Sequence, residues 1–383
     1  MTRRSHIRLA TERDLKPLAR LEQVAFEKDR FTEEQIDYLM GRSRATLFVL
    51  ELGSELVGAA YVLYRKAYHA ARLYNLAVDP AYQGSGFGHR LLHECELEAA
   101  RRSCSEITLE VRQDNEGGVR FYQRHGYVIR RSMSDYYEDG TAGYKMAKEI
   151  RLKVPPRVSL NIPYHAQTLD FTCGAACVMM ALKYFRPQQE LTRTLEMRIW
   201  KEATLVFMLS GYAGTDPFGL SLSCVDRGLT CRVMISLDTT PLLMSVRTAK
   251  KREIMKVVHS DMMRQARKSG VHRVICEYGI EEIVSALYRG LVPIALISTY
   301  RLTGDQVPHW VVVTGCERDY LYIHDPDLES YKKNKSRARH LRIRKSEFLR
   351  MSRYGKEVYR CLLLTGPPSG RISRPRPGPA AVG

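Results

Sequence analysis

The stretch Tyr82–Arg90, YQGSGFGHR, decides the fold of the first part of the chain. Its glycines are Gly84, Gly86 and Gly88, and a helical pattern follows directly. Glycine permits positive φ and a close approach of the backbone, so consecutive N–H groups can point at one anion. The positive end of the following helix adds to the same site. The turn therefore predicts a site for a pyrophosphate group.

The sequence on both sides of this turn alternates between strand and helix patterns. Thr32 and Gln35 have the spacing of a capping box, which predicts a helix start, and Gly53-Ser54 predicts a hairpin turn. The predicted strands are 6–9, 46–51, 56–64, 72–78, 106–111 and 127–131, and the predicted helices are 14–26, a second from residue 32, one from the glycine turn to 102, and 117–125. This alternation predicts a mixed α/β domain over residues 1–150.

Two titratable side chains after the turn fit acyl transfer. Glu110 lies on the predicted strand 106–111, and Tyr122 lies on the predicted helix 117–125. Transfer of an acyl group from a thioester to an amine requires a base for the amine proton and an acid for the leaving thiolate. A carboxylate and a phenol on neighbouring elements can supply both. Packing of Tyr122 and surface exposure of Glu110 remain alternative interpretations.

The motifs YQGSGFG, LEVRQDN and FYQRHGY occur in this order, and together they resemble the GNAT acetyltransferase superfamily. Over residues 6–148 the chain is similar to the ribosomal-protein alanine N-acetyltransferases. The resemblance implies a GNAT fold with a mixed central sheet, acetyl-CoA as cofactor and a peptide or protein amine as substrate. It implies Glu110 as the base and Tyr122 as the acid at the coenzyme A sulfur. The cofactor-binding residues that it implies are Leu76, Ala77, Val78, Gln83, Gly84, Ser85, Gly86, Phe87, Gly88 and Asn115.

Composition marks the boundaries beyond this domain. The adjacent prolines of KVPPRV, residues 153–158, disfavour helix on both sides, so we place a linker at 151–158. Residues 159–365 begin with helical patterns and end with strand patterns, which predicts an α+β domain. Residues 366–383 hold five prolines and four glycines, which predicts a disordered tail.

A nucleophilic cysteine is predicted near the start of the second domain. Cys173 precedes the helical run 175–184, and a helix N-terminus favours the thiolate form. A thiolate nucleophile needs a base and an oxyanion donor. His309 begins an apolar strand pattern as the candidate base, Asp325 ends the next strand pattern as its orienting group, and Gln167 offers an amide donor. Adjacent antiparallel strands would bring His309 and Asp325 together.

The order of these four residues resembles the papain-like cysteine peptidases. The detail is similar to the family that removes double-glycine leader peptides from bacteriocins, over residues 160–330. That family places an aspartate directly before the cysteine, whereas here two residues separate Asp170 from Cys173. A basic helical pattern at 248–268 is a further departure. The resemblance therefore implies a papain-like fold with a catalytic triad, and the departures leave the leader-peptide substrate in doubt.

The net charge of +18 is concentrated in the second half of the chain. Residues 1–150 have a balance of +1, and residues 151–383 have a balance of +17. The run YKKNKSRARHLRIRK, residues 331–345, contains eight Lys and Arg, and its alternation at 340–344 predicts an edge strand or an extended loop. Two interpretations stay open. The run is a solvated surface, or it attracts an acidic peptide or ribosomal RNA to the second site.

Other features of the sequence narrow the class of protein. The start, MTRRSHIRLATERD, lacks an apolar signal segment, and no apolar run approaches the about 20 residues that span a bilayer. The nine cysteines lack paired spacing, which fits a reducing compartment. We expect a cytoplasmic protein without a metal site, and the oligomeric state is not predicted. Cys177 and His324, near the proposed nucleophile and orienting group, are interpreted as a packing residue and a surface residue.

These patterns predict a bifunctional N-acetyltransferase that acts on a peptide or protein amine and carries a cysteine peptidase or amidase domain. Its role would be peptide or protein processing. One alternative is an acetyltransferase whose papain-like domain is catalytically silent and docks substrate. Another is an acetyltransferase for ribosomal-protein N-termini with a regulatory second domain.

Overall fold

The computed structural model describes residues 5–42, 44–65, 70–102, 104–150, 157–205, 214–241, 243, 246, 248–304, 307–331, 334–355 and 358–368. The chain divides into two compact units, Met1–Val154 and Pro155–Gly383. Residues 151–156 of the predicted linker and residues 369–383 of the predicted tail lie outside the described residues.

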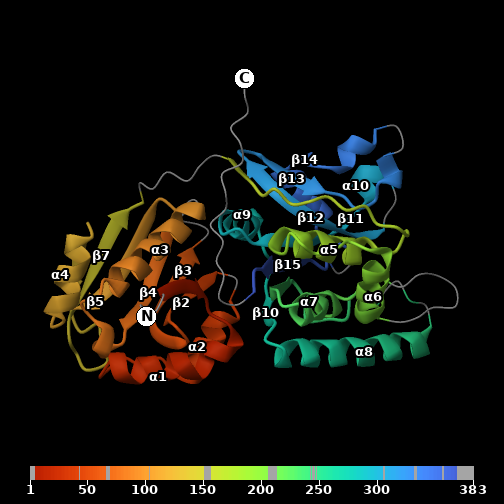
Figure 1. Cartoon of the computed structure of the whole chain (residues 1–383). Helices are drawn as coiled ribbons and strands as arrows, with labels where there is room; N and C mark the ends of the chain where they lie inside the picture. Colours follow the sequence, from red (N-terminus) through yellow and green to blue (C-terminus); the bar gives the residue numbers. More distant parts are fainter. Residues whose placement is uncertain are drawn as a thin grey trace. The chain divides into compact units, whose positions relative to one another are not determined.

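The first unit contains one mixed sheet with helices on its faces (Figure 1). The order of its described strands is β1-β2-β3-β4-β5-β7-β6, and all neighbours are antiparallel except β4 and β5. The elements are β1 (Ser5–Leu9), α1 (Leu15–Ala25), α2 (Glu33–Met40), β2 (Ala45–Leu52), β3 (Glu55–Arg65), β4 (Ala70–Val78), α3 (Phe87–Arg101), β5 (Glu106–Arg112), α4 (Glu116–Arg124), β6 (Val128–Met133) and β7 (Gly143–Glu149).

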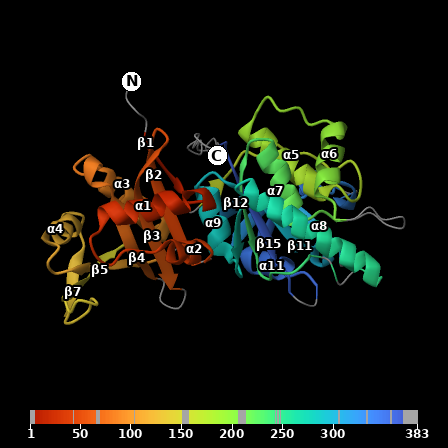
Figure 2. The same cartoon turned by 90° about the horizontal axis from the view of Figure 1, so that it is seen from below.

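The central strands of this sheet are buried on both faces, and their successive side chains point to opposite sides. Phe48 and Leu50 of β2 belong to the core formed with Leu91 of α3. Val49 belongs to a second core formed with Ile36 and other residues of α1 and α2. Figure 2 shows α1 and α2 in front of the sheet, so the central strands are covered on both sides.

The predicted elements of the first unit are present, with ends that differ by a few residues. The capping box is confirmed, since Thr32 accepts from the Gln35 N–H and Gln35 accepts from the Thr32 N–H. The hairpin across Gly53-Ser54 is confirmed by the pairing of β2 with β3. Strand β7 was not predicted. Its sequence, GYKMAKE, carries lysines among its apolar residues, which obscures the alternation.

The second unit is an α+β domain around a second mixed sheet. The strand order is β10-β9-β15-β11-β12-β13-β14, β8 pairs with β12, and only β10 and β9 are parallel. The elements are β8 (Arg157–Ser159), α5 (Cys173–Phe185), α6 (Arg193–Ala203), α7 (Pro217–Asp226), β9 (Thr230–Ile235), α8 (Ala249–Lys268), β10 (His272–Ile275), α9 (Ile280–Tyr288), β11 (Val292–Ser298), α10 (Tyr300–Thr303), β12 (Pro308–Glu317), β13 (Tyr320–His324), β14 (Leu341–Arg344), α11 (Lys345–Met351) and β15 (Cys361–Gly366).

Helix α5 is the centre of the second core. Its residues 173–182 are all buried, and α5, α7, α9 and α11 pack on the sheet (Figures 1 and 2). The predicted basic helix at 248–268 corresponds to α8. All nine cysteines of the chain are buried and none forms a disulfide. Among the residues that the structure describes, no helix is long and apolar enough to cross a bilayer.

Two predicted boundaries of the second unit need correction. The linker was placed at 151–158, but Arg157 and Val158 belong to β8, where Arg157 pairs with Glu317. The disordered tail was placed from Gly366, but this residue ends β15 and pairs with Thr230. In both cases a neighbouring strand satisfies the backbone hydrogen bonds, and local composition does not reveal such a partner.

Candidate active sites

The first candidate site lies where β4 and β5 part. These parallel strands pair only from Ala70 to Arg72 on β4 and from Glu106 to Thr108 on β5. Strand β4 continues to Val78, and no described strand pairs with that edge of Leu76–Val78. The predicted cofactor residues Leu76, Ala77 and Val78 therefore offer backbone groups to a partner other than the sheet.

The glycine turn follows this open edge and leads into α3. Gly84 and Gly86 have φ of 78° and 77°, and Gly86 is the N-cap of α3. A Cβ at either position would meet nothing within 4 Å, so space is left beside the backbone. The helix begins at Phe87, and its first N–H groups have no partner within the helix. The predicted anion site therefore has both required parts, a turn with exposed backbone and a helix N-terminus.

The other predicted cofactor residues lie around this turn. Gln83 and Ser85 are exposed, and Gly88 lies in the first turn of α3, where a Cβ would sit 3.5 Å from the ring of Phe121. Asn115 is the N-cap of α4, and its side-chain oxygen accepts from the Gly118 N–H at 2.8 Å. The structure thus gives Asn115 a helix-capping contact, and its role toward a cofactor stays a prediction.

Glu110 lies on β5, and two cations contact its carboxylate. Arg72 Nε donates to Glu110 Oε2 at 2.6 Å, and Lys145 Nζ lies 3.8 Å from Oε1. Arg72 also donates to the phenol of Tyr136 at 3.3 Å. The Glu110 side chain is only 11% exposed, so it is not the surface carboxylate of the alternative interpretation. Its Oε1 is the less engaged oxygen.

Tyr122 lies on α4, which packs against β5. Its half-buried ring contacts Phe121 and Tyr127, with centroid distances of 5.2 Å and 5.6 Å. Burial raises the pKa of Tyr122, and nearby Cys95 and Tyr137 act in the same direction. The phenol therefore keeps its proton at neutral pH, which is the state that a general acid needs. Its ring contacts also fit a packing role.

The second candidate site begins at the N-terminus of α5. Cys173 is the first residue of this helix, as predicted, and it is 8% exposed. The side chain of the N-cap residue Thr172 makes no capping hydrogen bond, so the dipole of α5 is left for the cysteine. Gly174 permits this placement, because a Cβ there would lie against Thr215 Oγ1 and 3.1 Å from Trp310 Cδ1.

His309 and Asp325 meet at the end of two antiparallel strands, as predicted. His309 lies near the start of β12, and Asp325 directly follows β13. His309 Nε2 lies 2.7 Å from Asp325 Oδ1, and both residues are buried. Burial alone would lower the pKa of His309, but the charges of Asp325 and Cys173 and hydrogen bonds to both raise it well above its usual value. The imidazole of His309 is therefore in contact with Asp325 and near enough to Cys173 to interact with it electrostatically.

Gln167 lies in the segment that leads into Cys173. Its backbone N–H donates to the Pro326 carbonyl at 2.9 Å, which ties this segment to the turn after Asp325. Its side-chain oxygen is buried, and it has no hydrogen-bond partner among the residues that the structure describes. The four predicted residues of the second site thus belong to one connected region.

Two tyrosines that the sequence reasoning missed hold Asp325. Tyr331 donates its phenol hydrogen to Asp325 Oδ2 at 2.8 Å, and Tyr164 donates to the Asp325 carbonyl at 2.9 Å. Burial would raise the pKa of Asp325, but His309, the Asp327 N–H and Tyr331 lower it. Tyr331 is the first residue of the basic run, and the charge pattern of that run gives no sign of its contact with Asp325.

A third missed residue, Glu196 of α6, supports the segment before the nucleophile. Its carboxylate is fully buried, and it accepts hydrogen bonds from Thr172 Oγ1 and from the Thr168 N–H at 2.8 Å. His165 Nε2 lies 3.5 Å from its other oxygen. The contact to Thr172 spans 24 positions in the chain, and no local motif signals it.

The surface position predicted for His324 is wrong. His324 is 1% exposed, because β14 lies alongside β13 and covers it. Its Nε2 contacts the Ile162 carbonyl at 2.9 Å, and its Nδ1 accepts from the His340 N–H at 3.1 Å. Burial lowers the pKa of His324 to about 4. It is therefore a neutral structural residue with both nitrogens engaged. Cys177 is fully buried in the α5 core, which confirms its packing role.

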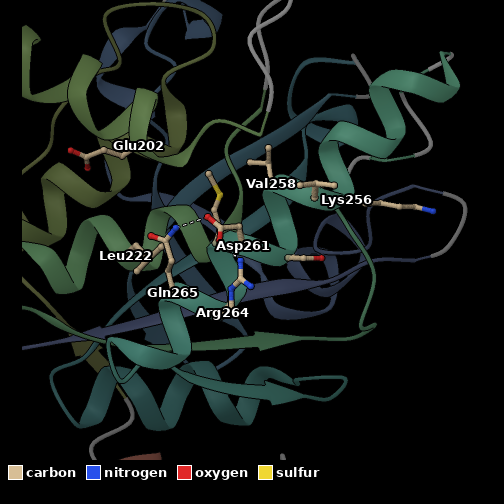
Figure 3. Close-up of a pocket in the computed structure, with 10 residues that line it drawn as sticks. Glu202, Leu222, Lys256, Val258, Asp261, Arg264 and Gln265 are labelled. Atoms are coloured by element: carbon tan, nitrogen blue, oxygen red, sulfur yellow. Dashed lines mark hydrogen bonds and ion pairs between the residues drawn. The ribbon is translucent and has the colours of Figure 1, made fainter.

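A hollow of about 690 Å³ lies beside α8 and contains none of the predicted site residues (Figure 3). Its lining includes Lys256, Asp261 and Arg264 of α8, with Glu202 of α6 and Leu222 of α7. Asp261 accepts from Arg264 at 2.5 Å, so these charges neutralise each other. We assign the hollow no chemistry.

Comparison with known proteins agrees with this division. Residues 13–127 match the Acetyltransferase (GNAT) family, and residues 162–365 match the Peptidase_C39 like family. An uncharacterized N-acetyltransferase of Methanocaldococcus jannaschii is 31% identical over 144 residues, which are 37% of this chain and 90% of that protein. The ribosomal protein bS18-alanine N-acetyltransferase of Escherichia coli K12 is 33% identical over 79 residues, 21% of this chain and 53% of that protein.

Among solved structures, the ribosomal-protein-S18-alanine N-acetyltransferase from Escherichia coli is similar to 39% of this chain and 97% of its own, at 26% identity and a TM-score of 0.36. The family matches fall on the two units separately, and the two candidate sites lie within them. The chain therefore belongs to the GNAT acetyltransferase family through its first unit and to the Peptidase_C39 like family through its second unit.

Proposed function

We propose that the chain is a bifunctional enzyme that acetylates an amine of a peptide or protein and hydrolyses a peptide bond or related amide. The observation that supports acetyl transfer best is the parting of β4 and β5 beside the glycine turn. The residues fit acetyl-CoA, because the space beside Gly84 and Gly86 admits a pyrophosphate and the α3 N-terminus faces the same turn. Acetyl-CoA would supply the activated acetyl group.

The residues around this gap have distinct tasks in the proposal. The open edge of Leu76–Val78 binds the extended arm of the cofactor through backbone hydrogen bonds, and the glycine turn binds its phosphates. Glu110 Oε1 takes the proton of the acceptor amine, while Arg72 holds the other oxygen. The protonated phenol of Tyr122 gives its proton to the departing sulfur.

The second activity is supported by the buried 2.7 Å contact between His309 and Asp325 beside the helix that begins at Cys173. His309 holds the proton of the Cys173 thiol while Sγ attacks the carbonyl carbon. The C–N bond then breaks as His309 passes this proton to the leaving amine, and a thioester remains on Cys173. Gln167 donates its amide hydrogen to the oxyanion, and Asp325 holds the imidazolium. Water releases the acid product. In the alternative function these residues bind a peptide without cleaving it.

The two activities suggest a sequence of events. Cleavage at the second site exposes a new α-amine, which the first site can acetylate. A tether between two sites keeps a shared peptide at an effective concentration of about millimolar. The proposed coupling rests only on the presence of both units in one chain.

The test uses the purified full chain with acetyl-CoA and peptides that offer either a free N-terminal alanine or only lysine amines. Thiol release reports acetyl transfer, and mass spectrometry reports acetylation and cleavage. Cys173→Ala should abolish cleavage and retain acetylation, whereas Tyr122→Phe should do the reverse. Cys177→Ala serves as a matched control.

Each outcome separates the alternatives. Preference for lysine amines would contradict an acceptor of the N-terminal type. Peptide binding without cleavage, unaffected by Cys173→Ala, would favour the silent docking domain. If a peptide is processed and acetylated equally by the wild type and by Cys173→Ala, the coupling is excluded.

A further inference from the structure

Four arginines, Arg337, Arg339, Arg342 and Arg344, lie on β14 and the turn before it. A fifth, Arg157 of β8, lies on the far side of β12 and β13 from that strand. We call this group the arginine face. All five side chains are exposed, and none forms an ion pair with a carboxylate among the residues that the structure describes. One acid, Glu317, lies among them, since it pairs in register with Arg157 and accepts from the Tyr322 hydroxyl. The five cations exceed this single carboxylate, and an acidic partner would gain energy by neutralising the excess charge.

The sheet orders three of these arginines against aromatic rings. Arg342 and Arg344 of β14 pair in register with Tyr322 and Tyr320 of β13. The guanidinium of Arg342 lies 4.6 Å from the Tyr320 ring centroid, and that of Arg157 lies 6.0 Å from the Tyr322 centroid. Stacking holds the planar groups in place and leaves their N–H edges toward solvent. Strand β14 ends the sheet, and its outer edge pairs with no described strand.

The remaining two arginines connect this face to the candidate triad. Arg337 and Arg339 flank the buried Ala338, whose carbonyl accepts from the Asp325 N–H at 2.9 Å. Arg339 stacks on Tyr164 at 4.8 Å, and Tyr164 in turn donates to the Asp325 carbonyl. The arginine face is therefore fixed to the same residue that orients His309.

Two other groups of residues in this chain pair arginine with carboxylates. Arg112 in the first unit contacts Asp29, Asp114 and Asp139 at 2.8–3.0 Å. On α8, Arg264 is paired with Asp261, as Figure 3 shows. The arginine face differs from these two groups. Four of its five guanidinium groups lie against aromatic rings, and none forms an ion pair with an acid among the residues that the structure describes.

We propose that the arginine face is a docking surface for an acidic peptide segment in extended conformation, which it leads to Cys173. The inference rests on the proposed peptide-directed function of the second unit. Guanidinium groups bind carboxylates through paired hydrogen bonds, and the outer edge of β14 can add a peptide as a further strand. Acidic side chains on alternate residues of that strand would reach Arg342 and Arg344, which project from the same face.

The surroundings favour a peptide over single-stranded RNA. RNA recognition of this kind uses aromatic faces on which bases stack. Here Tyr320, Tyr322 and Tyr164 already carry arginines on their rings. The site next to this face contains a nucleophile suited to carbonyl chemistry, and peptides contain such carbonyls.

The test measures binding of fluorescein-labelled hexaglutamate to the full-length Cys173→Ala chain by fluorescence polarisation, from about 50 to 300 mM salt. Arg342→Gln with Arg344→Gln should weaken binding about tenfold, because two exposed charge contacts are lost. The control changes Lys250→Gln with Lys256→Gln, which removes the same charge from exposed positions on α8. The control should bind within about twofold of the parent.

The remaining outcomes decide against the proposal. Equal weakening in both double variants would mean that only net charge attracts the peptide. A uridine 12-mer that binds more tightly than hexaglutamate and displaces it would identify the face as an RNA surface. Absence of binding at low salt would also overturn the inference. All these results are independent of catalysis, since the chain tested lacks Cys173, so an inactive second site leaves the inference intact.

Discussion

Replacing Asp325 by asparagine should destabilise the second unit most at mildly acidic pH. In the fold the pKa of His309 is raised, so its contribution to stability is complete below its ordinary value of about 6.5 and is lost as pH rises through the raised value. The pKa of Asp325 is lowered, so its contribution is present above about 3.9 and is lost as pH falls through the lowered value. Both contributions are therefore present between about pH 4 and 6.5.

The size of the effect follows from the contacts of Asp325. Asparagine keeps the shape. Its oxygen in the Oδ1 position can still accept from the Asp327 N–H, and its NH2 in the Oδ2 position can donate to the Tyr331 hydroxyl. The bonds of these two groups to Asp325 are 2.9 Å and 2.8 Å. The lost interaction is the buried charge-assisted bond to His309, which contributes about 1.5–3 kcal/mol. We expect a loss of about 2–3 kcal/mol at pH 5.5, falling toward about 1 kcal/mol once His309 is neutral.

Tryptophan fluorescence during urea unfolding measures this loss in the second unit alone. The chain has two tryptophans, Trp200 and Trp310, and both lie in that unit. Asp319→Asn is the control, because it makes the same chemical change at an exposed position in the β12–β13 turn and should cost less than about 0.5 kcal/mol. A loss for Asp325→Asn that is equal at pH 5.5 and pH 10, or that increases with pH, would refute the assigned imidazolium–carboxylate pair.

Three further changes test other parts of the two sites. Cys173→Ala should remove the fastest phase of iodoacetamide labelling. Cys177→Ala should retain that phase, because burial raises the pKa of Cys177. Peptide mapping identifies the labelled cysteine, and labelling without preference for Cys173 would indicate a silent domain. Tyr122→Phe should lower kcat for thiol release about 10²–10⁴-fold with little change in KM, and an unchanged kcat would leave only its packing role. Gly174→Ala should destabilise the second unit by about 1–3 kcal/mol in urea unfolding, since the new Cβ would lie 3.1 Å from Trp310. An unchanged midpoint of the urea transition would show that the neighbouring side chains adjust without cost.

The parts of the fold that the sequence predicted are those with a strong local signal. The apolar run after Cys173 predicted α5, because only a helix inside the core can bury such a run on all sides. The meeting of His309 with Asp325 was predictable, since a two-residue turn at Arg318-Asp319 joins their strands as antiparallel neighbours. The glycine turn likewise predicted positive φ and a helix start.

What could not be predicted depends on contacts between distant segments. The burial of His324 depends on β14, whose pairing partner is not visible in the basic run. Tyr331 reaches Asp325 because a short 3₁₀ turn at Glu329–Tyr331 brings the chain back. The same run contains exposed arginines and the half-buried hydrogen-bond donor Tyr331, so its average charge predicts neither role.

The segment before Cys173 shows how a missing local motif can be supplied from elsewhere. The expected aspartate directly before the cysteine is replaced by Thr172, whose hydroxyl donates to Glu196 of α6. A buried carboxylate is costly unless it is hydrogen-bonded. Burial would raise the pKa of Glu196, but His165, Thr168 and Thr172 lower it, so the charged form is retained. A carboxylate therefore still stands beside the residue before the nucleophile, and it comes from another helix. The departure in sequence is thus compatible with a preserved electrostatic environment at Cys173.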